Sequence, residues 1–317
     1  MNNFWKDLPK PFFILAPMEA VTDVVFRHVV AKAAKPDIFF TEFVNASSFC
    51  SKKGVASTKG RLTFTDDEQP MVAQIWGKKP DEFAVMCQAL VERGFKGIDL
   101  NMGCPDKSVV HGGSGSGLIR TPELATELIT AAKTCGLPIS VKTRLGDMKI
   151  EEWKTWIGFL LRQDIVNLTV HLRTRKEMSK VPAHFNLIPE IIKLRDEIAP
   201  NTLITINGDV RDRQHGEELA KQYGVDGIMI GRGVFMNPFA FETDKRDHTR
   251  SELIELLNYQ IDQHDKYSAE LETRKFDPLK RYLKIYIRDF PNASELRDKL
   301  MHTKSTDEVR TIIKNIL

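Results

Sequence analysis

Residues 97–105 read GIDLNMGCP, an apolar run that ends in a polar residue, a glycine, a thiol and a proline. Gly103 lets the backbone turn sharply, and Pro105 cannot continue a hydrogen-bonded ladder. The pattern predicts a buried strand whose carboxyl end presents Cys104 on a loop. Reactive groups of α/β enzymes lie at such strand ends, whereas a buried structural thiol is the alternative interpretation.

Seven other β-rich runs have the same form, and helical patterns separate them. The eight runs are 12–16, 38–42, 71–75, 97–100, 139–142, 166–171, 203–206 and 227–230. Two of the intervening helical patterns begin at Pro80 and Pro122, as the first turn of a helix allows. Eight strand–helix units in series predict an α/β fold, a closed parallel (β/α)₈ TIM barrel. An open doubly wound sheet is the alternative.

The strand runs occupy residues 1–241, which we predict to be one catalytic barrel domain. From residue 242 the sequence is charged and helical, with an apolar stripe formed by Leu253, Ile254, Leu256, Leu257 and Ile261. A small all-helical domain is therefore predicted at 242–317.

The chain has 317 residues, of which 42% are hydrophobic, enough for a large core and against global disorder. Its four cysteines show no paired spacing and no Cys/His cluster, so we expect no metal site and a reducing, cytoplasmic environment. No run has the length of a membrane span, and the first residues lack a signal peptide's apolar segment. We expect a monomer, because no motif requires a partner subunit.

Almost every predicted strand ends on a polar, charged or glycine residue. The carboxyl ends of parallel barrel strands share one face, so these residues are expected to line one site. They are Pro17, Met18 and Glu19, then Glu42, Gln74, Asn101, Lys142 and His171, and finally Asn207, Gly208, Asp209, Gly231, Arg232 and Gly233.

The last two strand ends carry glycines, in Asn207-Gly208-Asp209 and Gly231-Arg232-Gly233. Barrels often bind phosphate at their seventh and eighth loops, where glycine lets backbone N–H groups approach an anion and an arginine adds a charged contact. Tight turns that need glycine for steric reasons are the alternative.

Gln74, Lys142 and His171 offer groups that suit a flavin. A lysine stabilises the anionic reduced ring at its N1/O2 edge, a histidine can hydrogen-bond the ring, and an amide can pair with the pyrimidine edge. A lysine in a parallel strand is costly unless it serves a site. A surface lysine and a capped loop histidine are the alternative interpretations.

The segment 274–288 contains six basic residues and one acidic residue. It is predicted to be a helix with an apolar side formed by Tyr282, Leu283, Tyr286 and Ile287 and a basic rim formed by Lys280, Arg281, Lys284 and Arg288. A solvated helix face explains the rim adequately, and a surface that binds phosphodiesters is the sharper hypothesis.

The strand-end motifs, taken in order, resemble those of the tRNA-dihydrouridine synthases. The resemblance runs from about residue 15 to residue 238, and a helical part follows as in that family. It is carried by 16–19 (APME), 41–43 (TEF), 73–74 (AQ), 99–105 (DLNMGCP), 141–146 (VKTRLG), 170–174 (VHLRT), 207–209 (NGD) and 229–233 (MIGRG).

The resemblance implies an FMN-dependent oxidoreductase that reduces the C5–C6 bond of a uridine in tRNA, with NADPH or NADH as electron donor. It implies that hydride passes from flavin N5 to C6 and that Cys104 protonates C5. Asn101 would hold the target base, Arg173 would lie near the substrate, and Lys280, Arg281 and Lys284 would contact tRNA. The implied FMN contacts are Pro17, Met18, Glu19, Gln74, Lys142, His171, Asn207, Gly208, Asp209, Gly231 and Arg232.

One departure from the family pattern follows Cys104. Ser116-Gly117 stands where many members carry alanine and a bulkier residue, inside a glycine-rich stretch that we expect to be a mobile loop closing over the base. Two other functions stay open, an FMN barrel enzyme acting on a free small molecule and a non-catalytic RNA-binding protein. Only the tRNA reductase and the RNA-binding protein need the basic segment.

Overall fold

The computed structural model describes residues 3–271, 275–288 and 290–314. Eight parallel strands form its centre, and each pairs with the next around a closed barrel because β2 pairs with both β1 and β4. The predicted TIM barrel is confirmed, and the open sheet is excluded. The strands are β1 (Phe12–Leu15), β2 (Ile38–Phe40), β4 (Met71–Trp76), β5 (Gly97–Met102), β6 (Ile139–Arg144), β7 (Asn167–His171), β8 (Leu203–Asn207) and β9 (Gly227–Ile230). The short β3 (Val44–Asn45) adds to β4 beside the closed ring.

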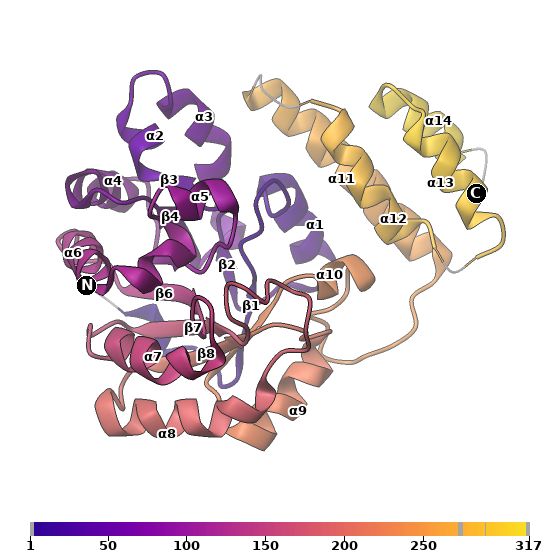
Figure 1. Cartoon of the computed structure of the whole chain (residues 1–317). Coiled ribbons are helices and arrows are strands. Elements are labelled where there is room, and N and C mark those ends of the chain that lie inside the picture. The colour runs from indigo at the N-terminus through magenta and orange to yellow at the C-terminus, as the bar shows by residue number, and fades with distance from the viewer. Residues whose placement is uncertain (1–2, 272–274, 289, 315–317) are drawn as a thin grey trace.

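Helices surround the barrel, as Figure 1 shows. They are α1 (Val24–Ala34), α2 (Ala46–Cys50), α3 (Val55–Lys59), α4 (Pro80–Glu92), α5 (Lys107–His111), α6 (Pro122–Lys133), α7 (Trp153–Leu161), α8 (Ile188–Ile198), α9 (Arg213–Tyr223) and α10 (Gly233–Met236). Pro80 and Pro122 open α4 and α6 as predicted, because the first turn needs no proline N–H. No helix among the described residues is both long and apolar enough to cross a membrane.

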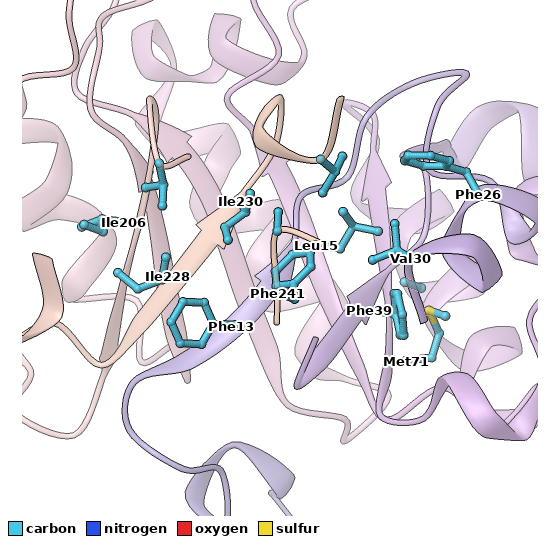
Figure 2. Close-up of a cluster of buried hydrophobic side chains, with 14 of the residues drawn as sticks. Phe13, Leu15, Phe26, Val30, Phe39, Met71, Ile206, Ile228, Ile230 and Phe241 are labelled. Carbon is cyan, nitrogen blue, oxygen red and sulfur yellow. The ribbon is translucent and has the colours of Figure 1, made fainter. Parts of the chain in front are cut away.

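Alternate residues of β1 belong to two different layers of the core. Phe12 and Ile14 pack in one cluster with Met229, whereas Phe13 and Leu15 pack in the larger cluster that includes α1. Figure 2 shows Phe13 and Leu15 beside Ile228, Ile230 and Phe241 of that larger cluster. This alternation is what a strand buried on both faces requires, and it fixes which side chains point inward at the strand ends.

The chain beyond the barrel forms α11 (Arg250–Leu271), α12 (Leu283–Tyr286), α13 (Ala293–Met301) and α14 (Thr306–Lys314), which lie together on the α1 side of the barrel (Figure 1). The predicted stripe from Leu253 to Ile261 is buried. The Tyr282 ring stacks on Phe26 of α1 with ring centroids 4.8 Å apart, and its hydroxyl donates to Val21 O at 2.7 Å. The helical part therefore shares a core with the barrel, and a domain boundary at 241/242 stays a prediction.

The prediction of one helix over 274–288 is wrong for the described part of that segment, and Arg274 lies outside the described residues. A 3₁₀ helix, η7 (Asp277–Tyr282), precedes the short α12. Pro278 sits in its first turn, and the tight winding buries Leu279 and Tyr282 together. Tyr282, Leu283, Tyr286 and Ile287 are buried, so the predicted apolar side is confirmed.

One fully buried ion pair fastens α1 to the segment before β4. Arg27 Nε donates to Glu68 Oε1 at 2.6 Å, and neither side chain is exposed. The guanidinium also donates to Thr22 O at 2.9 Å and Thr63 O at 2.7 Å, while Thr65 N donates to Glu68 at 2.8 Å. Both charges are thus nearly saturated with hydrogen bonds, which is the condition under which a buried pair is tolerated.

Candidate active site at the carboxyl ends of the strands

The loop that carries Cys104 is held from both sides. Asn101 Oδ1 accepts from Gly103 N at 3.1 Å and from Cys104 N at 2.9 Å, so a side chain on β5 fixes the turn. The carbonyl of Cys104 accepts from Ser116 N at 3.0 Å and from Ser116 Oγ at 2.8 Å. The thiol is therefore presented by a backbone with little freedom to shift.

A chain of buried hydrogen bonds leads from Asp99 to this loop. Gln74 Nε2 donates to Asp99 Oδ2 at 2.7 Å, and Asn101 Nδ2 donates to Gln74 Oε1 at 3.0 Å. Ser140 Oγ donates to the other Asp99 oxygen at 2.6 Å. At one end of the chain, the Asp99 carboxylate can only accept hydrogen bonds. At the other end, the backbone N–H groups of the loop can only donate them. Together they fix which way the side-chain amides of Gln74 and Asn101 are turned.

Burial is the main cause that raises the pKa of Asp99 to about 6, and the hydrogen bonds from Ser140 and Gln74 oppose it. The carboxylate form consequently prevails at neutral pH, as the chain of donors requires. Asp99 had no predicted role in the site. The sequence indicated its importance only by placing a charged residue in the middle of an apolar strand. A buried charge is destabilising unless other groups bind it.

The glycine-rich stretch after Cys104 is folded rather than a free loop. It follows α5 and includes a 3₁₀ helix, η4 (Gly115–Arg120), and Ser114, Ser116 and Leu118 are buried. A Cβ on Gly115, where φ is +57°, would lie 2.8 Å from Cys104 O, so only glycine fits there. The stretch thus contains a 3₁₀ helix, while its mobility and its closure over the base stay predictions. The departure at Ser116 gives the Cys104 carbonyl one of its hydrogen bonds.

The thiol of Cys104 is half-buried, and burial raises its pKa above the ordinary value. At neutral pH the sulfur therefore carries its proton. A cavity of about 510 Å³ lies against the thiol. Phe43, Trp76 and Val109 give it apolar walls, and Asn45 and Asp106 give it polar groups.

Cationic side chains gather at the ends of β6 and β7. Burial lowers the pKa of Lys142 to about 8, with the nearby Arg144 adding to the effect. Burial also holds the pKa of His171 well below its usual range, and Arg144, Lys142, Arg173 and Arg232 reinforce this. The ring is thus neutral, and Arg173 Nη1 lies 3.2 Å from His171 Nε2, as a donor to an accepting nitrogen would. Such a collection of positive charge suits an anionic ligand.

Arg173 is almost fully buried at 2% exposure and links two of the predicted cofactor residues. Besides approaching His171, it donates to a carboxylate oxygen of Asp209. Arg232 donates to the other Asp209 oxygen at 3.2 Å, and its side chain is otherwise exposed. Asn207 Nδ2 is tied to Met229 O at 2.9 Å. The strand ends of β7, β8 and β9 therefore form one connected group.

The glycines of the two motifs at the ends of β8 and β9 differ in their structural roles. A Cβ on Gly233 would lie 2.1 Å from Arg211 O, so this glycine is required by packing. Gly208 has φ +113°, a conformation that favours glycine. A Cβ on Gly231 would meet only ordinary contacts, Ala16 Cβ at 3.6 Å and Met18 Sδ at 3.8 Å. Gly231 thus leaves backbone open beside Arg232, where an anion could approach.

The remaining predicted residues lie at the rim or away from the barrel centre. Glu19 is exposed and forms an ion pair with Arg61 beside the Cys104 cavity. Lys280 pairs with Asp277 at 3.0 Å, and Arg281 donates to Ala20 O at 2.5 Å. Lys284 is exposed. Of the three predicted tRNA contacts, Lys284 is therefore the most available to a partner.

Arg144 is a second residue of the site for which no role was predicted. It is 5% exposed, and its guanidinium donates to Gly103 O at 2.8 Å and to Met178 O at 2.8 Å. It thereby braces the turn before Cys104 from β6. The spacing Lys142-x-Arg144 places both side chains on one face of the strand. This spacing of two residues was the feature of the sequence that could have indicated a role for Arg144 beside Lys142. Within the described residues, no group of three or more His, Cys, Asp or Glu side chains could hold a metal ion.

Comparison with known proteins extends over nearly the whole chain. The family model described as dihydrouridine synthase (Dus) matches residues 14–316. The chain is 61% identical over 312 residues to the "Probable tRNA-dihydrouridine synthase 2" of Bacillus subtilis (strain 168), covering 98% of this chain and 96% of that protein. It is 59% identical over 312 residues to the "Probable tRNA-dihydrouridine synthase" of Staphylococcus aureus (strain COL), covering 98% and 95%.

Among solved structures, the barrel is similar to that of a 2-naphthoyl-CoA reductase complex, with a TM-score of 0.55 at 8% identity over 72% of this chain. It is also similar to 6-hydroxypseudooxynicotine amine oxidase from Pseudomonas geniculata N1, with a TM-score of 0.52 at 10% identity over 75% of this chain. This chain covers 48% and 49% of those proteins, so about half of each. At such identities the likeness concerns the fold alone.

Proposed function

Because the chain belongs to the dihydrouridine synthase family, we propose that it reduces the C5–C6 bond of uridines in tRNA to give 5,6-dihydrouridine. It would be an oxidoreductase acting on a CH–CH group, with NADPH or NADH as electron donor. The observation that carries the proposal is Cys104, a protonated thiol on a rigid turn beside a cavity at the carboxyl ends of the strands.

The arrangement of donors and charges fits FMN at the ends of β6 to β9. Lys142, Arg173 and Arg232 provide positive charge, and Gly231 leaves backbone accessible for a phosphate. Gln74 Nε2 has a second hydrogen beyond the one given to Asp99, which can meet a ring carbonyl. Met18, three residues beyond β1, borders the same region beside Gly231, and Asn207 and Asp209 bound it at the end of β8. Pro17 and Gly208 stay predicted contacts.

FMN, when bound, supplies the hydride that uracil C6 accepts. Negative charge then spreads over C5 and O4 of the base, and the Cys104 thiol donates its proton to C5. Burial keeps that proton on sulfur at neutral pH, so the acid is ready before the base arrives. Asn101, with its side chain bound to the turn, would approach the base from β5, and Arg144 holds the turn from the opposite side.

The substrate must reach the cavity as an unstacked base, because a uridine inside folded tRNA cannot expose C5 and C6 to a barrel. We propose that the exposed basic residues of the 275–288 segment help to bind the tRNA backbone. We also expect the protein to act in the cytoplasm, which agrees with its four free cysteines, and to be a monomer.

The direct test is to incubate the purified protein with FMN, NADPH and unmodified tRNA and to map dihydrouridine position by position. Dihydrouridine at defined sites is expected. Flavin reduction by NADPH without any dihydrouridine in any tRNA would contradict the proposal and favour a small-molecule substrate.

Asp99→Leu is expected to lower the rate of tRNA reduction about 100-fold, because misplacing a reactive group by about 1 Å has effects of this size. The substitution removes the acceptor that orients Gln74 and, through it, Asn101 and the Cys104 turn. Asp99→Asn keeps one acceptor toward Gln74 and should recover most of the rate. Steady-state kinetics of both variants measure the effect, with Asp99→Asn as the matched control. An unimpaired Asp99→Leu enzyme would show that the chain of hydrogen bonds does not act on the thiol.

Alkylation of Cys104 by iodoacetamide is expected to accelerate with pH through a midpoint above about 8.5, the value of a free thiol. Burial raises this pKa, so the reactive thiolate appears only at more alkaline pH. Mass spectrometry of the labelled peptide at a series of pH values gives the midpoint, with N-acetylcysteine as the reference. A midpoint below neutrality would mean a thiolate at working pH and would refute the acid role.

Lys284→Glu is expected to weaken tRNA binding at low salt and to reduce the slope of log K against log salt by about one. Lys284 is exposed, whereas Lys280 is engaged with Asp277 and should contribute less. Filter binding across a salt series measures Lys284→Glu and, for comparison, Lys280→Glu. An unchanged slope for Lys284→Glu would mean that this face is only solvated.

A further inference from the structure

A second cavity, of about 470 Å³, lies where the helical part meets the barrel. The barrel side contributes Val25, Glu42 and Arg61, and the helical side contributes Gln260, Leu279 and Tyr282. Ser57 and Arg61 line both this cavity and the one beside Cys104, so the two adjoin. Its volume is within the range of small-molecule sites, about 300–1,000 Å³. None of the residues assigned above to FMN or to the reaction lines it.

Two buried side chains of this cavity carry polar atoms that have no hydrogen-bond partner in the described part of the chain. Gln260 is fully buried; its Oε1 accepts from the Tyr286 hydroxyl, but its Nε2 has no acceptor among the described residues. Glu42 is 5% exposed, and only burial and charged neighbours, with no hydrogen bond from a described residue, act on its carboxyl. A buried polar atom without a partner is destabilising, so the unpaired Gln260 Nε2 calls for an explanation.

The free atoms define a pattern that a ligand must complement. The carboxylate of Glu42 offers two acceptors, and Gln260 Nε2 offers a donor, since Oε1 is already occupied. The complementary ligand edge has two donors and one acceptor. The Watson–Crick edge of guanine carries N1–H and the 2-amino group as donors beside the O6 acceptor. Uracil has one donor between two acceptors, and adenine and cytosine have a single amino group beside an acceptor nitrogen.

We propose that this cavity binds a guanine base, from a nucleotide close to the target uridine in the same RNA. Glu42 would accept from N1–H and the 2-amino group, Gln260 would donate to O6, and Val25, Leu279 and Tyr282 would enclose the ring. The proposal rests on the proposed function and deepens it, because contacts to flanking nucleotides are how enzymes that act on unstacked bases select their sequence context. The chain would then read the identity of a base as well as the shape of the RNA.

The ionisation of Glu42 decides the conditions for a test. Burial is the main cause that raises its pKa to about 7, with Asp23 and Glu19 raising it further and Arg61 and Arg27 opposing them. At pH 8 the carboxylate form prevails and offers both acceptors. Binding measurements at this pH therefore examine the site in the state that the proposal requires.

The test compares GMP with IMP, which lacks only the 2-amino group, by titration calorimetry on the FMN-loaded protein at pH 8. We expect GMP to bind about tenfold more tightly than IMP, because IMP cannot make the hydrogen bond from a 2-amino group to the charged carboxylate. Glu42→Gln should bring the ratio of the two affinities close to one, and Gln260→Met should weaken both nucleotides. Glu92→Gln, an exposed position on α4, is the matched control and should keep the wild-type ratio.

Equal affinities for GMP and IMP in the wild type, no GMP binding at millimolar concentration, or a preference for GMP that survives Glu42→Gln would each overturn the guanine site. Thermal unfolding and flavin content of each variant identify a folding defect, and the second variant at Gln260 then carries the test. Formation of dihydrouridine by the wild type is measured in parallel. If it is seen while GMP fails to bind preferentially, the proposed function stands and only the guanine site is lost.

Discussion

Cys104→Ala should abolish reduction of tRNA, with a loss of at least about 100-fold in the rate of dihydrouridine formation, as expected when a general acid is removed. The thiol lies against the 510 Å³ cavity and carries its proton at neutral pH, so the substitution removes the proton donor that the proposal requires. The variant should still bind FMN and oxidise NADPH, because the cationic group at β6 to β9 is untouched. Flavin content, NADPH oxidation and mapped dihydrouridine are the three measurements.

Cys50→Ala is the matched control, because Cys50 is exposed on α2 and its thiol donates to Glu82 O of α4, outside the barrel. It should behave as the wild type in all three measurements. A Cys104→Ala enzyme that still makes dihydrouridine at the normal rate would remove the thiol from the reaction. Loss of flavin in that variant would instead mean that Cys104 serves binding.

Arg27→Met should lower the free energy of unfolding by about 3–5 kcal/mol, the cost of leaving one buried charge without its partner. Glu68 would lose its 2.6 Å bond, and Thr22 O and Thr63 O would lose their donor. Urea unfolding followed by fluorescence measures the change. The double variant Arg27→Met/Glu68→Met removes both charges and should recover part of the loss.

Arg246→Ala is the comparison for this prediction. Arg246 pairs with Glu252 at the surface, where its side chain is 54% exposed, and exposed pairs contribute about 0–1 kcal/mol. If Arg27→Met destabilised the chain no more than Arg246→Ala does, the buried ion pair would not hold α1 to the segment before β4.

The barrel and the residues at its strand ends could be predicted because the signal is local. Each run of apolar residues and the polar residue that ends it are adjacent in sequence, and parallel strands carry their ends to one face. The hydrogen bonds that connect Asp99, Gln74 and Asn101 cross between neighbouring strands, so their existence depends on register, which a strand's own sequence does not specify. The role of Arg144 could not be predicted for the same reason, since one of its acceptors is the carbonyl of Gly103 on the turn after β5.

The segment after residue 274 failed as a predicted helix because its environment overrides its periodicity. Leu279 and Tyr282 are three residues apart, and a 3₁₀ turn aligns them on one side where the barrel receives them. The cavity under this segment was likewise beyond prediction, as its walls come from residues about 220 apart in sequence, such as Glu42 and Gln260.

The stacking of Tyr282 on Phe26 has a consequence for how the protein can be handled in the laboratory. With the C-terminal helices docked through a shared apolar core, a chain truncated after residue 241 would expose Phe26 and its neighbours to water. Such a fragment should aggregate during expression, and limited proteolysis of the intact protein should not release a stable barrel. Recombinant work is therefore best carried out on both parts as a single polypeptide.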